Sequence, residues 1–284
     1  YTNSMIMGWM VDEYSKIKRE FIPSIITGKP IPLGGSLGRE DATGRGGFYA
    51  LESLKERLGL GTKPLKIAVQ GFGNSGFHFA RLAAEAGHKI VAVSDSKGGI
   101  YRADGIDPVS VNTFKQQHKE LKAAYCQGSV CEIVDHESIS NEDLLALDVD
   151  VLVPAALENV LTEENADRVS AKVLVELANG PVTNAADEIM EKKGIMVVPD
   201  ILANAGGVTV SYFEWVQNRQ GFYWPVDEVH TRLKDIMVRA AHEVADLAEE
   251  HKTSQRTAAY IAALKRINES VRAKGTLRNF RVRA

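Results

Sequence analysis

Apolar residues gather along the chain in short runs that alternate with helix-like stretches. Each run has about the length of one buried strand. The runs lie at 66–70, 89–94, 149–153, 172–177 and 195–198. Helical patterns follow at 77–84, 163–169 and 185–192. Strand and helix in alternation predict an α/β fold, a doubly wound sheet of parallel strands with helices on both faces.

Helical patterns also flank this alternation. An apolar stripe with spacings of three and four predicts an N-terminal helix that ends at or soon after Pro23. Its members are Ile6, Met10, Tyr14 and Ile17. Beyond Pro199 the strand pattern stops, and residues 204–218 predict one helix. Two further stripes predict two more helices: Val229, Leu233, Ile236, Ala240, Val244 and Leu247, then Tyr260, Leu264, Ile267 and Val271.

Residues 27–47 are rich in glycine and proline, which predicts a loop or a hinge. A helical pattern follows at 48–58, and Gly59 with Gly61 is typical of its C-terminal cap. We therefore expect three parts. Residues 1–27 form a linking helix, 28–203 a nucleotide-binding domain, and 204–284 a set of C-terminal helices.

Composition narrows the class of protein. The chain is 44% apolar and 25% charged, as in globular proteins, and its net charge of −3 favours neither nucleic acid nor an anionic membrane as partner. The sequence has no long apolar span and no signal-like start, so a cytoplasmic protein is expected. Cys126 and Cys131 lack the spacing of zinc or redox pairs, so reduced thiols and no metal site are expected.

The first chemical motif follows the first predicted strand. Gly71, Phe72, Gly73, Asn74, Ser75 and Gly76 match GxGxxG. The pattern alone is weak, but here it joins a strand to a helix, and Asp95 follows at the end of the next strand. This context predicts a Rossmann site whose phosphates face a helix N-terminus. A turn that merely joins strand to helix is the alternative.

Asp95 bears on the choice of cofactor. A carboxylate there accepts hydrogen bonds from a ribose diol and repels a 2′-phosphate, which favours NAD over NADP. Ser94, Ser96 and Lys97 surround it and could hold a phosphate. NAD is therefore the favoured cofactor, with NADP left open.

Three further segments carry a resemblance to a known family. They are 38–46 (GREDATGRG), 176–183 (ELANGPVT) and 204–215 (NAGGVTVSYFEW). With the glycine turn, they make the chain resemble glutamate dehydrogenases of the prokaryotic hexameric type, from residue 1 to about residue 275. The resemblance implies oxidative deamination of L-glutamate to 2-oxoglutarate and ammonia, with hydride transfer to NAD(P), in a homo-hexamer.

The resemblance also implies site residues. Beyond the glycine turn, the expected cofactor contacts are Thr43, Asp95, Ser96, Ala155, Ala156, Asn179 and Asn204. Val208 and Ser211 share a helix face and are expected to bind the amino acid, with Ser211 donating to its distal carboxylate. Plainer alternatives stay open: Thr43 as a helix N-cap, Asn179 as a turn residue, and Ser211 bonded to its own backbone.

No catalytic residue is expected within this chain. In the family a lysine of depressed pKa in a glycine-flanked segment and an aspartate carry the proton chemistry. The resemblance places both before Tyr1, in an N-terminal substrate domain that is expected to be absent from this chain. The helix at 1–27 is expected to belong to that domain or to link from it. We therefore expect the chain to bind the cofactor yet turn over little glutamate by itself. The alternatives are a non-catalytic Rossmann binding or assembly module, and a dehydrogenase for leucine or phenylalanine.

Overall fold

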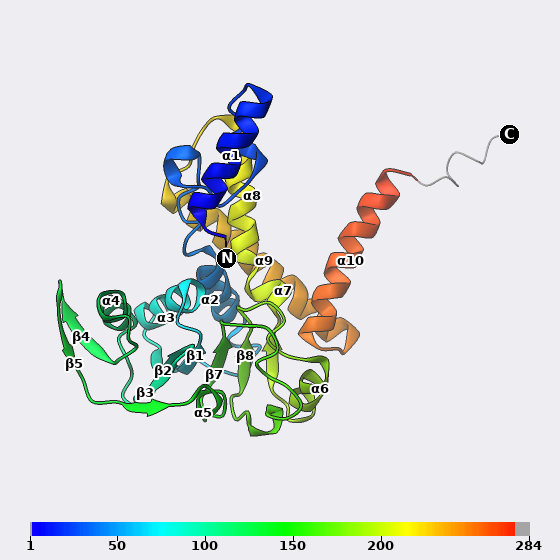
Figure 1. The fold of residues 1–284 in the computed structure, drawn as a ribbon. Coiled ribbons are helices and arrows are strands. Elements are labelled where there is room, and N and C mark those ends of the chain that lie inside the picture. The colour runs from blue at the N-terminus through cyan, green and yellow to red at the C-terminus, as the bar shows by residue number, and fades with distance from the viewer. Residues whose placement is uncertain (1, 276–284) are drawn as a thin grey trace.

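The computed structural model describes residues 2–275 and centres on a seven-stranded sheet, with strand order β6-β3-β2-β1-β7-β8-β9 (Figure 1). Five neighbouring strands are parallel: β2, β1, β7, β8 and β9. They span Lys89–Asp95, Lys66–Gln70, Val151–Pro154, Val173–Val175 and Met196–Val198. β3 (Gly98–Tyr101) and β6 (Glu137–Ile139) extend one edge antiparallel. The Rossmann-type sheet is confirmed, although it is mixed at this edge.

Successive strand residues face two different cores. In β1, Ile67 and Val69 pack into one cluster and Ala68 into the other, and β7 and β8 divide their residues in the same way. All three of these β1 side chains are fully buried. Since side chains alternate across a strand, an unbroken apolar run is what a sheet covered on both faces requires.

Helices cover both faces. On one side lie α2 (Ala42–Leu54), α3 (Asn74–Glu85) and α9 (Val226–His251), whose apolar residues share a core with the sheet. On the other side lie α5 (Asn141–Leu145) and α6 (Asn184–Lys192). α4 (Pro108–His118) packs beside α3, next to the edge of the sheet.

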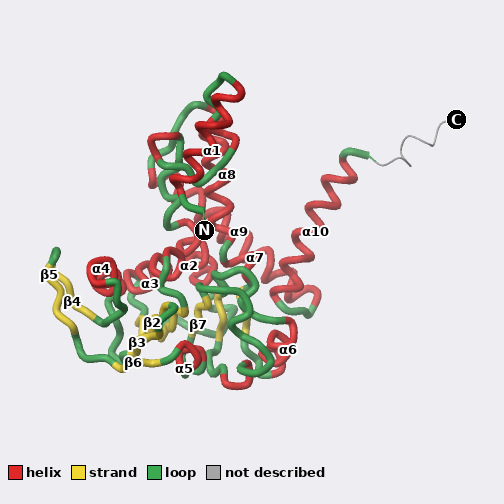
Figure 2. The backbone as a smooth tube through the Cα atoms, viewed as in Figure 1, coloured by secondary structure: helices red, strands yellow, loops and turns green. Residues whose placement is uncertain are grey.

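The remaining elements rise away from the sheet, as the tube view shows (Figure 2). α1 (Ser4–Lys18) stands beside α8 (Ala205–Gln220). Of the two short helices that follow α1, η1 (Pro23–Ile25) contacts α8, and Leu33 of η2 (Ile31–Leu33) lies close to Gly8 of α1. A fully buried ion pair fastens this lobe, because Lys29 Nζ donates to Glu214 Oε1 of α8 over 2.5 Å. The short α7 (Asp200–Ala203) leads into α8, and α10 (Gln255–Ala273) projects from the body.

Two expected boundaries were wrong. α2 begins at Ala42, so the end of the expected 27–47 loop is helical. Its glycines fit there because a Cβ at Gly46 would lie 2.8 Å from the Cα of Gly206 in α8, and the two helices cross too closely for side chains. α1 ends at Lys18, where Arg19 adopts a left-handed conformation, five residues before Pro23.

Two expected helix faces are also exposed. On α10, Tyr260, Leu264 and Ile267 are each more than half exposed, whereas the alanines Ala258 and Ala262 are buried. The apolar stripe therefore predicted the helix but not the side that packs. The N-terminal stripe behaves alike, with its Ile17 69% exposed.

The cysteine prediction was wrong. Cys126 and Cys131 form a disulfide between β4 (Ala124–Gln127) and β5 (Val130–Ile133). These strands form a separate antiparallel hairpin whose register sets the two residues opposite each other, with their Cα atoms 4.1 Å apart. A hairpin of this register brings the thiols within bonding distance, and spacing alone does not reveal it.

Some structure went unpredicted or falls outside the description. The sequence pattern missed β3, β4, β5, β6, α4, α5 and α7. Residues 163–169, expected to be helical, form a turn followed by the short 3₁₀ helix η3 (Ala166–Arg168). Tyr1 and residues 276–284, which belong to the first and last of the three expected parts, lie outside the described residues.

Within 2–275, no group of three or more His, Cys, Asp or Glu residues could hold a metal ion. No helix in that range has the length and hydropathy needed to cross a membrane.

Candidate functional site: a dinucleotide cleft at the carboxyl ends of the strands

The glycine turn joins β1 to α3, and each of its glycines meets a different requirement. Gly71 has φ +98°, and a Cβ there would lie 2.7 Å from the backbone nitrogen of Ala156. At Gly76 a Cβ would collide with the carbonyl oxygen of Gly71. At Gly73 a Cβ would meet nothing within 4 Å, and φ is −95°. Gly71 and Gly76 are therefore needed by the fold, whereas Gly73 leaves open space beside the backbone.

That open space lies at the positive end of a helix. Gly73 is the N-cap of α3, and no side chain caps the N–H groups of the first turn. The neighbouring strand holds the turn in place, because the N–H groups of Gly71 and Phe72 both donate to the carbonyl of Ser94 on β2, over 3.1 and 2.6 Å. A rigid turn with uncapped N–H groups suits an anionic ligand such as a diphosphate.

Asp95 is the last residue of β2, the strand next to β1 in the sheet. Its Oδ2 lies 2.9 Å from Lys115 Nζ of α4, and its Oδ1 accepts from the N–H of Lys97 over 2.9 Å. Burial raises the pKa of the Asp95 carboxyl, but the hydrogen bonds and charges of Lys115 and Lys97 outweigh it and hold the pKa below its usual value. Asp95 is therefore an ionised carboxylate that already has partners.

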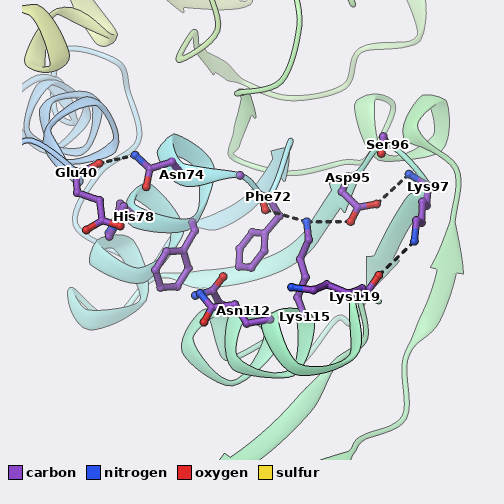
Figure 3. Close-up of a pocket in the computed structure, with 13 residues that line it drawn as sticks. Glu40, Phe72, Asn74, His78, Asp95, Ser96, Lys97, Asn112, Lys115 and Lys119 are labelled. Atoms are coloured by element: carbon purple, nitrogen blue, oxygen red, sulfur yellow. Dashed lines mark hydrogen bonds and ion pairs between the residues drawn. The ribbon is translucent and has the colours of Figure 1, made fainter. Parts of the chain in front are cut away.

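The turn and Asp95 line one cavity of about 550 Å³ (Figure 3). Five of the expected cofactor contacts face it: Phe72, Gly73, Asn74, Asp95 and Ser96. Asn74 is fixed by donating from Nδ2 to the carbonyl of Glu40 over 2.5 Å. At the opposite end of the cavity, Ser96 lies with the lysines of α4 and of the β2–β3 turn. The cavity has room for part of a nucleotide, and ten of its thirteen lining residues have polar side chains.

A buried clamp fixes the end of β2. Ser94 is fully buried, and its hydroxyl donates to Oδ1 of Asn141 over 2.7 Å. Asn141 in turn donates from Nδ2 to the carbonyl of Asp95 over 2.8 Å. Ser94 thus supports the strand end and does not face the cavity.

β1 and β7 are neighbours at the centre of the sheet, and the chain leaves them toward opposite edges. Ligands of open α/β sheets bind outside the carboxyl ends of such a strand pair. Ala155 and Ala156 follow β7 there, and the Ala155 N–H donates to the carbonyl of Gln70 over 2.7 Å. Ala156 lies close to the glycine turn, since a Cβ at Gly71 would be 2.7 Å from its side chain, but neither alanine lines the cavity.

Asn179 and Asn204 meet farther along the same edge, where Asn204 Nδ2 donates to Asn179 Oδ1 over 2.7 Å. The loop that carries Asn179 begins after Glu176, whose side chain is fully buried. Arg256 of α10 donates to both oxygens of Glu176, over 2.6 and 2.9 Å, and also binds Asp187. Burial raises the pKa of the Glu176 carboxyl, and the guanidinium opposes that rise. An ion pair between a fully buried carboxylate and a partly exposed guanidinium therefore supports this loop.

Ser211 lies on α8, and its hydroxyl accepts a hydrogen bond from Arg39 Nε over 3.0 Å. The hydroxyl therefore bonds to Arg39 and not, as the plainer alternative had it, to the backbone of its own helix. Burial lowers the pKa of the Arg39 guanidinium, and the carboxylate of Glu214 opposes that shift. Val208, one turn earlier, is 69% exposed. Arg39, Ser211 and Val208 thus place a cation, a hydroxyl and an exposed apolar side chain together at α8.

Thr43 lies opposite α8. It occupies the second position of α2, whose N-cap is Asp41, so the N-cap alternative for Thr43 is excluded. A Cβ at Gly207 would lie 2.5 Å from Thr43 Oγ1. Gly207 therefore lets α8 approach the threonine hydroxyl closely.

The comparisons with known proteins agree with this geometry. The family model for glutamate, leucine, phenylalanine and valine dehydrogenases matches residues 34–275. The chain belongs to this dehydrogenase family.

Named relatives in the family use either cofactor. The chain is 52% identical over 276 residues to the NADP-specific glutamate dehydrogenase of Synechocystis sp., a match that covers 97% of this chain and 64% of that protein. It is 43% identical to the NAD-specific glutamate dehydrogenase GudB of Bacillus subtilis, covering 97% of this chain and 62% of that protein. The chain thus spans less than two thirds of the length of these relatives.

A solved structure of the same family shares the fold. The hetero-hexameric glutamate dehydrogenase of Thermus thermophilus matches with a TM-score of 0.87 and 35% identity, over 96% of this chain and 63% of that one. The glutamate dehydrogenase of Peptoniphilus asaccharolyticus matches with a TM-score of 0.80 and 36% identity, over 96% of this chain and 63% of that one.

For this family member, the structure divides the expected residues into groups. One group surrounds the turn and Asp95, and a second joins Asn179 to Asn204. The third lies at α8, where Thr43 packs against Gly207 and the helix itself carries Val208 and Ser211. The sequence did not predict Arg39 beside Ser211, or Lys115 beside Asp95. Arg39 stands in the segment that carries the family resemblance and could have been found there. Lys115 lies on an unpredicted helix, so the sequence pattern offered no signal for it.

Proposed function

We propose that this chain binds NAD or NADP at the β1–α3 turn. We further propose that it forms the cofactor-binding part of an enzyme that oxidatively deaminates L-glutamate to 2-oxoglutarate and ammonia. The observation that carries the proposal is the open space at Gly73, between two glycines that the fold requires. That space lies beside uncapped helix N–H groups, in a chain of the glutamate, leucine, phenylalanine and valine dehydrogenase family.

Each part of the cofactor would meet a different set of residues. The diphosphate would lie on the N–H groups of Gly73, Asn74 and Ser75, at the start of α3. The adenosine ribose would face Asp95 and Ser96. The nicotinamide end would lie along the β7 and β8 edge, toward the residues Ala155, Ala156, Asn179, Asn204 and Thr43.

The amino acid would approach from the α8 side. When bound, the nicotinamide accepts a hydride from the α-carbon of the substrate. Ser211 could donate its hydroxyl proton to the distal carboxylate of glutamate, since it now accepts from Arg39 and its own proton is free to point outward. Arg39 adds a positive charge beside that carboxylate, and Val208 offers an apolar contact.

The Arg39–Ser211 pair favours glutamate over an apolar amino acid. A leucine or phenylalanine side chain would bury the Arg39 guanidinium and the Ser211 hydroxyl without a carboxylate to bind them, which penalises binding. A dehydrogenase for leucine or phenylalanine is therefore the second candidate. Assays of the full-length enzyme against all three amino acids would decide between them.

Three further expectations remain predictions. They are a homo-hexamer, supported by the hetero-hexameric relative from Thermus thermophilus, a cytoplasmic location, and low glutamate turnover by this chain alone. Sedimentation analysis would test the first. A glutamate-dependent absorbance assay on the 284-residue chain would test the last.

Calorimetric titration of the chain with NAD and NADP tests the main proposal. Binding of at least one of them with a Kd in the micromolar range supports it. Absence of binding of both at millimolar concentration would instead support a non-catalytic Rossmann module.

A variant sharpens this test. We expect Gly73→Val to weaken cofactor binding at least about tenfold because its side chain fills the space that a diphosphate needs. Its unfolding temperature should match the wild type, since the position is extended and uncrowded. Ala86→Val, at the exposed far end of α3, is the matched control and should bind as the wild type does. Equal binding by Gly73→Val and the control would place the cofactor elsewhere.

A further inference from the structure

The carboxylate at the proposed ribose site differs from a free one. Both oxygens of Asp95 already have partners, Lys115 Nζ at 2.9 Å and the Lys97 N–H at 2.9 Å. A free carboxylate at this position discriminates against NADP because its negative charge repels the 2′-phosphate. With an ammonium in contact, most of that repulsion is offset.

Lys115 is held in place by a second contact. Its Nζ also donates to the carbonyl of Phe72 in the glycine turn over 3.0 Å. The lysine therefore bridges the turn that would hold the diphosphate and the aspartate that would meet the ribose. Its side chain is 26% exposed, so its charge remains accessible from the cavity.

Other positive groups gather at the same end of the cavity. Lys97 and Lys119 line it with Lys115, and the Ser96 hydroxyl lies beside them (Figure 3). Glu40, the other carboxylate of the lining, is at the opposite end with Asn74 and His78. Lys115 contacts Asp95, whereas the Lys97 ammonium donates to the carbonyl of Lys119 over 3.2 Å. Three lysines and one carboxylate thus line this end of the cavity. A 2′-phosphate carries about −1.5 to −2 charges near neutral pH, and lysines and hydroxyls are suitable partners for it.

We infer that the cleft accepts the 2′-phosphate of NADP, and that Lys115 is the residue that decides cofactor preference by pairing with Asp95 and facing the phosphate. This inference rests on the proposed function, because it assigns a specificity to the same cleft. It revises the preference for NAD that the sequence favoured. The two named relatives do not decide the matter, since one is NADP-specific and the other NAD-specific.

Titration of the wild type and of Lys115 variants with NADP and NAD tests the inference. The wild type should bind NADP at least as tightly as NAD. Lys115→Met should weaken NADP at least about tenfold and NAD less than about threefold, since only NADP carries the phosphate. Lys115→Arg keeps the charge and should retain most of the NADP affinity. Lys89→Met, at the exposed opposite end of β2, is the matched control and should change neither affinity.

The outcomes separate the two proposals. NAD binding more than about tenfold tighter than NADP in the wild type would overturn the inference and leave the proposed function intact. Equal loss of both cofactors in Lys115→Met and Lys115→Arg would overturn it too, because the lysine would then only support the fold. Binding of neither cofactor by the wild type would overturn the proposed function itself.

Discussion

The two halves of the proposed cleft are built differently. The half at the β1–α3 turn consists of backbone, glycines and a paired carboxylate, and surrounds a cavity of about 550 Å³. The half at α8 consists of side chains on a helix face, where Val208 is 69% exposed and Tyr212 60% exposed. The first half forms a lined pocket within this chain. The second offers one open wall for a substrate.

This difference follows from what each half has to recognise. A diphosphate needs N–H groups and close backbone approach, which one turn between a strand and a helix supplies. An amino acid needs a charge and a hydroxyl at set positions, and α8 depends on distant contacts to provide them. Those contacts are the buried Lys29–Glu214 pair and the Arg39–Ser211 bond. Substitutions in the two halves should therefore produce separable effects.

The largest expected effect is on folding stability and comes from the Arg256–Glu176 ion pair that supports the Asn179 loop. Arg256→Met leaves the buried Glu176 carboxylate without its main partner, and removing one member of a buried pair costs about 3–5 kcal/mol of folding free energy. Chemical denaturation measures this loss. Arg266→Met, which breaks an exposed pair on the same helix, should cost less than about 1 kcal/mol. Similar losses in both variants would mean that the buried pair is not a special support.

Ser211→Ala tests the α8 half alone. Losing one hydrogen bond to a carboxylate costs about 1.5–3 kcal/mol, so KM for glutamate in the full-length enzyme should rise about 10- to 150-fold. The Kd for the cofactor should stay unchanged because the glycine turn is a separate region. Ser270→Ala removes an exposed hydroxyl that is bonded within α10 and serves as the control. A rise in cofactor Kd instead would show that the two halves are coupled.

The smallest effect concerns acid stability at Asp95. A carboxyl whose pKa is held low in the folded state stabilises the fold above its unfolded pKa of about 3.9, and this contribution is lost as pH falls through the folded value. The wild type should therefore lose more stability than Asp95→Asn when urea unfolding is followed from pH 5 to below about pH 4. Parallel pH dependence in the two proteins would contradict the pairing of Asp95 with Lys115.

The sequence predicted the parallel strands and the glycine turn because these features are local. A buried parallel strand is an apolar run, and GxGxxG between strand and helix has one common use. The expected strand at 66–70 matches β1, and the helix at 185–192 differs from α6 by one residue. Features that depend on tertiary contacts were missed. The glycines of α2 are typical of a loop, and only the close crossing with α8 explains why they lie in a helix. Lys115 was missed because it lies twenty positions along the chain from its partner Asp95.

Hydrogen exchange of the chain with and without NADP tests the central claim most directly. If the cofactor lies in the proposed cleft, amide exchange should slow at residues 71–76, 94–97 and 155–156. It should change little at residues 264–273 of α10, the part of that helix that projects from the body. Slower exchange confined to other segments, with unchanged exchange at residues 71–76 under saturating NADP, would contradict the account.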